Sequence, residues 1–265
     1  RLDAADCLDL DFLNALQGFT KARRSDFWLM GEVVHGDYRH WANLETLDTV
    51  TNYETYKALY SSLIEGNYHE VAYALNRQFG PDGLYRDLWL YNFVDNHDVD
   101  RVASKLQDPG LLYPLYLLLF TMPGIPSIYY GSEWGIKGWK EGWSDAPLRP
   151  ALDLNHIRTA DPQPDLLWDI QRLAKLRKEF PSLRLGDYRQ VLVAPRQFAF
   201  QRQTEQETII VALNSDQNAT RVDLPTSQQA GTWVDVLSGD ERFVIHQGRV
   251  QMSLPGKWGR VLKLT

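Results

Sequence analysis

The chain has 265 residues, of which 44 % are hydrophobic and 23 % are charged, and its net charge at pH 7 is −6. This length fits one large domain, or a medium domain followed by a small one. The negative charge argues against nucleic acid as a partner, because phosphate binding requires a basic surface. The longest apolar run, residues 111–122, is too short to cross a bilayer, so no membrane partner is expected.

Cysteine and aromatic content narrow the function further. The single cysteine, Cys7, excludes an internal disulfide, and the sequence has no cysteine and histidine cluster at zinc spacing. The compartment stays open, with the cytoplasm favoured because one cysteine is compatible with a reducing environment. The 9 tryptophans and 13 tyrosines suit a sugar-binding protein, because sugar rings have apolar faces that stack on aromatic side chains.

The first part of the chain alternates extended and helical patterns. Residues 1–6 predict the end of a buried strand, and because residue 1 is not Met we expect a segment upstream of it. The elements predicted after it are helix 8–24, strand 26–31, a weaker strand 47–50, helices 53–65 and 69–78, strand 88–94, helix 111–120, strand 125–130 and helix 166–180. Such alternation is typical of βα units and a parallel sheet.

After residue 185 the hydrophobic period changes to two. Seven short runs follow, separated by turn residues: 190–194, 198–202, 208–213, 219–224, 232–237, 249–254 and 260–264. This pattern predicts a small antiparallel β-sandwich. We therefore divide the chain into residues 1–184 and 185–265, and we expect the two parts to pack together because no low-complexity linker separates them.

Acidic residues stand at the ends of the predicted parallel strands, namely Asp3, Glu32, Asp98 and Glu133. Parallel-sheet and (β/α)-barrel enzymes carry their catalytic residues at these ends. Retaining cleavage of a glycosidic bond needs two carboxyl groups about 5–5.5 Å apart. An aspartate at a strand end is more often a helix cap than a catalyst, and spacing alone cannot pair these residues, so both interpretations stay open on this basis.

Four motifs, in order, resemble those of the α-amylase family of retaining glycoside hydrolases. They are residues 1–6, 27–32, 93–98 and 124–133. The resemblance implies that Asp3 is the nucleophile, held by Arg1, and that Glu32 is the general acid/base. It also implies that Asp98 stabilises the transition state and that His97 binds sugar hydroxyls. A structural ion pair between Arg1 and Asp3 is the alternative.

Further substrate contacts are predicted in the loops. Asp145 and Arg149 look like the family pair that binds the glycone side of the glucan. Tyr38 and Trp41, in the loop after Glu32, could line the aglycone side, with packing inside the loop as the alternative. Stacking on glucan is also predicted for the three tryptophans of the loop after the last parallel strand, Trp134, Trp139 and Trp143.

The sequence departs from the family pattern just after Asp3. The family often has Lys-His where Asp6 and Cys7 stand, and this histidine often helps a calcium site. Calcium is therefore an open prediction for a longer parent protein. No metal ligand and no certain cofactor is assigned within this chain.

The resemblance implies an α/β fold, a (β/α)8 TIM barrel of which this chain holds the end of strand four through strand eight, followed by an antiparallel β-sandwich. The expected partners are an α-glucan or maltooligosaccharide substrate and the N-terminal half of the barrel, because the family's first motif is absent. The predicted reaction is retaining cleavage of α-1,4-glucosidic bonds, and this stretch alone is expected to be inactive. Alternatives are a transglycosidase, an isomerase, a cyclodextrin-acting enzyme or a catalytically silent binding subunit.

Overall fold

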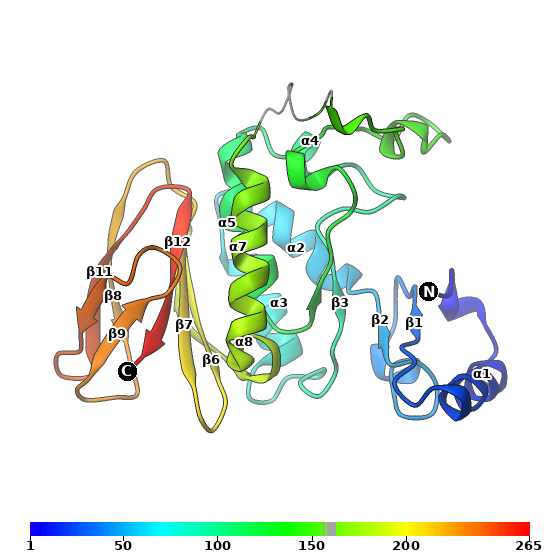
Figure 1. Ribbon diagram of the computed structural model, residues 1–265, viewed down its shortest axis with the longest axis horizontal. Coiled ribbons are helices and arrows are strands. Elements are labelled where there is room, and N and C mark those ends of the chain that lie inside the picture. Colours follow the sequence, from blue (N-terminus) through cyan, green and yellow to red (C-terminus); the bar gives the residue numbers. More distant parts are fainter. Residues whose placement is uncertain (156, 158–162) are drawn as a thin grey trace.

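A parallel array of short strands runs through the first part of the chain. The computed structural model describes residues 1–155, 157 and 163–265 (Figure 1). The parallel strands are β1 (Met30–Gly31), β2 (Thr49–Val50), β3 (Tyr91–Asn92) and β4 (Ile125–Pro126). β1 pairs with β2 and β3 pairs with β4, and parallel bridges join Leu2 to β1 and Thr51 to β3. The strands therefore lie side by side in sequence order, starting from residue 2.

Helices precede β1, separate β2 from β3 and β3 from β4, and follow β4, whereas β1 and β2 are joined by a loop with the 3-10 turn Tyr38–His40. The helices are α1 (Leu10–Arg23), α2 (Tyr53–Ile64), α3 (His69–Phe79), α4 (Val102–Lys105), α5 (Leu112–Thr121), α7 (Leu166–Glu179) and α8 (Pro181–Leu185). Asp9 and Asn52 cap α1 and α2, because their side chains accept hydrogen bonds from the first-turn backbone. The five predicted helices are confirmed with small shifts at their ends, and the short helices α4 and α8 were not predicted.

The predicted lengths of the parallel strands need correction. The strands predicted over 26–31, 88–94 and 125–130 pair over only two residues each, because an apolar run shows extended backbone but not how much of it forms a ladder. The apolar residues of α1 do not form a buried face. Only Leu13 of α1 is buried, whereas Phe12 and Phe19 are 51 % and 56 % exposed.

The second part is antiparallel. Its strands are β5 (Asp187–Val193), β6 (Gln197–Gln203), β7 (Thr208–Asn214), β8 (Thr220–Pro225), β9 (Thr232–Asp235), β10 (Arg242–Val244), β11 (Arg249–Leu254) and β12 (Trp258–Leu264). Six form a sheet in the order β10-β9-β12-β7-β6-β5, and β11 pairs with β8 in a separate sheet. The seven predicted strands are present, and β10 was missed because it has only three residues. The predicted division after residue 184 falls inside α8.

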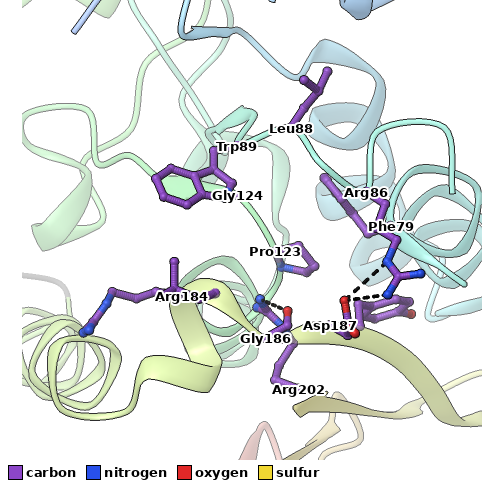
Figure 2. Close-up of a pocket in the computed structure, with 12 residues that line it drawn as sticks. Phe79, Arg86, Leu88, Trp89, Pro123, Gly124, Arg184, Gly186, Asp187 and Arg202 are labelled. Carbon is purple, nitrogen blue, oxygen red and sulfur yellow. Dashed lines mark hydrogen bonds and ion pairs between the residues drawn. The ribbon is translucent and has the colours of Figure 1, made fainter. Parts of the chain in front are cut away.

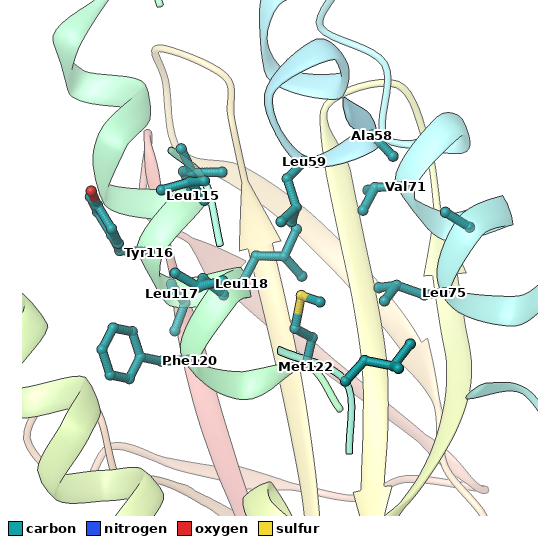
Figure 3. Packing of buried hydrophobic residues seen from close by; sticks show 14 of the residues in the cluster. Ala58, Leu59, Val71, Leu75, Leu115, Tyr116, Leu117, Leu118, Phe120 and Met122 are labelled. Carbon is teal, nitrogen blue, oxygen red and sulfur yellow. The ribbon is translucent and has the colours of Figure 1, made fainter. Parts of the chain in front are cut away.

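The six-stranded sheet is buried on both faces, which joins the two parts. Phe198, Phe200 and Val211 belong to the core shared with the helices, whereas Ile210 and Ala212 belong to the core shared with β8 and β11. Helix α5 is apolar all round, with nine of its ten residues buried, since it lies between this sheet, α2 and α7. Figure 3 shows side chains of α2, α3 and α5 gathered over the sheet.

Buried polar contacts fix the junction between the parts. Arg202 is 1 % exposed and donates to the carbonyl oxygens of Thr121, Leu183 and Gly186. A pocket beside it has a volume of about 50 Å³ (Figure 2), well below the roughly 300–1,000 Å³ of small-molecule sites. It is lined by Trp89 and Gly124, which precede β3 and β4, so it lies at the amino ends of the strands. Within the described residues, no helix is long and apolar enough to cross a membrane.

Candidate active site

The predicted nucleophile and acid/base lie on neighbouring segments at the carboxyl end of the parallel array. The amide of Leu2 donates to the Met30 carbonyl at 2.8 Å, and the Glu32 amide donates to the Leu2 carbonyl at 2.9 Å. This pairing sets Asp3 beside Glu32. The Arg1 guanidinium contacts both carboxylates, with Nη1 at 3.1 Å from Asp3 Oδ1 and Nη2 at 2.5 Å from Glu32 Oε2.

The two carboxyl groups have different surroundings. The Asp3 side chain is 79 % exposed and that of Glu32 is 11 % exposed. Hydrogen bonding with Glu32 lowers the pKa of Asp3, and the charge of Arg1 lowers it further, followed by a weaker effect of His97. An accessible carboxylate that stays ionised beside a buried carboxyl group is the arrangement that a nucleophile and an acid/base require.

A second cluster forms after β3. Arg149 Nη2 lies 3.0 Å from Asp98 Oδ1, and His97 Nε2 lies 3.0 Å from Asp98 Oδ2. Arg149 also lies 3.3 Å from Asp145 Oδ2, and Lys140 Nζ lies 3.0 Å from Asp145 Oδ1. The structure thus brings the predicted residues Asp98, His97, Asp145 and Arg149 into one chain of contacts.

Tyr53 connects the two clusters, and sequence reasoning did not select it. Its hydroxyl donates to Glu32 Oε1 at 3.1 Å and accepts from Asn96 Nδ2 at 3.1 Å. Burial is the largest cause that raises the pKa of Tyr53 to about 12, and the charges of Glu32 and Asp98 add to it. Tyr53 stands shortly after the end of a predicted strand, a position that could have indicated a site residue. From the sequence it was assigned only as the start of the predicted helix 53–65.

A buried network supports the loops that carry this site. Asp95 is 2 % exposed, and burial is the first cause that raises its pKa. Ser132 Oγ lies 2.8 and 2.9 Å from the two Asp95 oxygens. Arg101, which is fully buried, donates to Ser132 Oγ and to the carbonyls of Tyr130 and Leu148. The loop after β3 is therefore fastened to the loop after β4.

A hollow of about 210 Å³ opens at this end of the array. Its lining combines polar groups of the site with aromatic side chains of the strands, including Arg1, Asn96, His97, Tyr91, Phe93 and Tyr129. A polar end and an apolar, aromatic wall suit a sugar, whose ring has both hydroxyl edges and an apolar face.

Comparison with known proteins decides the family. Residues 5–197 match the family model described as the alpha amylase catalytic domain. The chain belongs to the α-amylase family. Residues 188–258 match the model described as the maltogenic amylase C-terminal domain. The α-amylase-family chain therefore consists of catalytic-domain sequence followed by an antiparallel C-terminal domain.

This α-amylase-family chain is similar to several named proteins. It is 26 % identical to a cyclomaltodextrinase of Bacillus sp, over 82 % of this chain and 38 % of the relative. It is 27 % identical to neopullulanase 2 of Thermoactinomyces vulgaris, over 99 % of this chain and 44 % of the relative. The crystal structure of an Anoxybacillus alpha-amylase shares its fold, with a TM-score of 0.83 at 24 % identity, over all of this chain and 58 % of that one. The chain spans less than half the length of these curated relatives.

Two of the loop aromatics of this α-amylase-family chain, Tyr38 and Trp134, are buried. Tyr38 is 2 % exposed and packs on Tyr85, with ring centroids 5.1 Å apart, so it has no face free for an aglycone sugar and that prediction is corrected. Trp134 is 9 % exposed and is also corrected. Trp41 is partly buried against the core, and its predicted contact stays a prediction. Trp139 and Trp143 are exposed.

No group of three or more histidine, cysteine, aspartate or glutamate side chains within the described ranges could hold a metal ion. Asp6 and Cys7, which stand where the family often has Lys-His, lie at the 3-10 turn Ala5–Cys7. Calcium binding by a longer parent protein stays a prediction.

Proposed function

We propose that this chain supplies the catalytic carboxylates of a retaining enzyme that cleaves α-1,4-glucosidic bonds in starch-type glucans or maltooligosaccharides. One observation carries the proposal: the Arg1 guanidinium contacts both Asp3 and Glu32. A single planar group that reaches both side chains keeps them at one site. Retention needs such proximity, since its two carboxyl groups lie only about 5–5.5 Å apart.

In the proposed reaction, Asp3 attacks the anomeric carbon while Glu32 gives its proton to the departing glycosidic oxygen. The bond to that oxygen breaks and a glycosyl ester of Asp3 forms. Glu32, now ionised, takes a proton from a water that attacks the same carbon, and Asp3 is released. Asp98 stabilises the positive charge that develops on the sugar, and His97 donates to a sugar hydroxyl.

A second candidate is transfer to a sugar in place of water. The chemistry up to the glycosyl ester is the same, and the product depends on which hydroxyl takes part in the second step. This candidate is supported by a cyclomaltodextrin glucanotransferase of Geobacillus stearothermophilus, which is 32 % identical to this chain over 149 residues, 56 % of this chain and 20 % of the relative. The cyclomaltodextrinase relative supports action on cyclodextrins.

We also propose that Leu2 and β1 to β4 are strands four to eight of a (β/α)8 barrel. Their parallel pairing in sequence order supports this. The other strands would come from an N-terminal half in the full-length protein.

The test is Glu32→Gln in the natural full-length protein. Turnover of maltooligosaccharides should fall about 100- to 10,000-fold, since an amide cannot transfer the proton, while maltooligosaccharide binding measured by calorimetry is retained. Glu45→Gln, an exposed glutamate outside the site, is the matched control. Normal turnover in Glu32→Gln would refute the acid/base role. Products formed from amylose, cyclodextrin, pullulan and maltotriose would separate hydrolysis from transfer.

A further inference from the structure

A chain of hydrogen bonds runs from the backbone of Asp98 to the carboxylate of Glu32. Asn96 Oδ1 accepts from the backbone amides of Asp98 at 2.8 Å and Val99 at 3.1 Å. Asn96 Nδ2 donates to the Tyr53 hydroxyl, and that hydroxyl lies 3.1 Å from Glu32 Oε1. Three neighbouring segments of the parallel array thus contribute to one connection: the ends of β1 and β3 and the start of α2.

The donors and acceptors fix the direction of this chain. Two backbone amides occupy Asn96 Oδ1, so the amide nitrogen must be the group that faces Tyr53. An amide NH₂ only donates, so the Tyr53 oxygen accepts from it. The one hydroxyl hydrogen of Tyr53 is then left for Glu32 Oε1. Asn96 therefore orients Tyr53 as a donor toward the carboxylate.

The ring that carries this hydroxyl is held by its neighbours. Tyr53 is the first residue of α2, directly after Asn52, whose side chain caps the helix. Its ring lies edge-on to Phe93, with centroids 4.9 Å apart, and edge-on to Tyr56, at 6.0 Å. Because these contacts restrict the ring, the hydroxyl stays near Glu32 without a large loss of conformational freedom on each turnover.

We propose that Tyr53 is a positioning residue for Glu32, and that with Asn96 it favours the ionised form of Glu32 that must activate water in the second step. The proposal rests on the proposed function, because it assigns a partner to the acid/base of that reaction. A donor to a carboxylate stabilises its charge. The Tyr53 pKa of about 12 keeps the hydroxyl protonated, and so a donor, at neutral pH.

Other charged groups face the same carboxylate and must be held constant in a test. Arg1 and Asp3 approach it from the N-terminal segment. From the loop after β3, Asp98 interacts with the same tyrosine, and His97 lies in contact with Asp98. Replacing only the tyrosine hydroxyl leaves all four in place.

The experiment is the pH profile of kcat/KM for a maltooligosaccharide, measured for the natural full-length protein and Tyr53→Phe. Without the hydroxyl, the Glu32 carboxylate loses a hydrogen-bond donor, so the basic limb of the profile should move up by about one pH unit. Asn96→Asp keeps the acceptor for the two backbone amides but turns the Tyr53 hydrogen toward itself. It should move the same limb in the same direction, which keeps the test available if Tyr53→Phe folds poorly.

Tyr56→Phe is the matched control. Tyr56 packs on the same Phe93, with centroids 4.9 Å apart and planes at 15°, but the tyrosine hydroxyl that donates to Glu32 is that of Tyr53. Its profile should match that of the unmodified protein. A basic limb that stays in place in Tyr53→Phe and Asn96→Asp, while Glu32→Gln is inactive, would overturn the positioning role alone. Full turnover in Glu32→Gln would instead overturn the proposed function.

Discussion

Replacing Ser132 by alanine should weaken the contact that joins the loops after β3 and β4. Ser132 Oγ has one hydrogen, which points to the Asp95 carboxylate at 2.8–2.9 Å, and it accepts from Arg101 Nη1 at 3.1 Å. Asp95 would keep only the backbone amide of Val102, at 3.0 Å. Loss of a hydrogen bond to a buried charge costs about 1.5–3 kcal/mol. Arg101 keeps two carbonyl partners, so we expect a total of about 2–3 kcal/mol.

The pH dependence of this cost follows from the Asp95 carboxyl. Burial raises its pKa above 3.8, and the Ser132 hydrogen bond opposes that rise. Without Ser132 the pKa of Asp95 rises further, because the ionised form loses a donor. At low pH Asp95 is protonated in both the folded and the unfolded state, so the cost of Ser132→Ala is smallest there. The cost should grow as pH rises through the raised pKa of folded Asp95, and reach its full value above the still higher pKa that Asp95 has in the variant.

The assay is urea unfolding of the full-length protein and its variants at neutral pH and near the unfolded pKa of Asp95. Ser104→Ala is the matched control. Ser104 joins the same two loops, but its partners are the neutral amide and carbonyl of Gly138. It should cost about 1 kcal/mol at every pH. An equal cost of Ser132→Ala at both pH values would refute the assignment of an ionised, buried Asp95 to this network.

Two further predictions concern the domain junction and the exposed tryptophans. Arg202→Met should lower the free energy of unfolding by about 3 kcal/mol, because it leaves three buried carbonyls without their donor. Arg189→Met, which removes only a bond to Gln201, is its control in the same denaturation assay. Trp143→Ala should raise KM roughly three- to tenfold for long maltooligosaccharides but not for maltotriose, if the exposed ring stacks on distal sugars. Trp168→Ala, with a ring 70 % exposed on α7, should change neither value.

The order of elements followed from hydrophobic periodicity, but the extent of strand pairing did not. Burial alternates along β8 and β11, as a period of two predicts, whereas β6 and β7 are buried on both faces. The parallel strands gave only apolar runs, since a run such as 125–130 looks the same whether two or six residues form a ladder. The exposed rings of α1 show the opposite difficulty. Helical spacing of apolar residues indicates a face, but it does not say whether that face is covered.

The site shows which functional residues a sequence can reveal. Asp3, Glu32 and Asp98 stand in motifs whose roles come from the resemblance, and the structure brings their side chains into connected contacts. For Tyr38 and Tyr53, the position in the sequence suggested the wrong surroundings. Tyr38 lies in a loop, where an aromatic residue suggests ligand contact, yet its ring is buried.

Tyr53 lies at a helix start, where an aromatic residue suggests core, yet its hydroxyl reaches Glu32. The two tyrosines differ in the group that donates a hydrogen bond to the phenol oxygen. For Tyr38 that oxygen accepts from the Glu54 backbone at 3.2 Å, inside the fold. For Tyr53 it meets Asn96, a residue 43 positions away. The parallel bridge between Thr51 and Tyr91 places β2 beside β3, and this brings Tyr53 close to Asn96. The contact depends on the order of the strands in the sheet, so the local sequence around Tyr53 could not predict it.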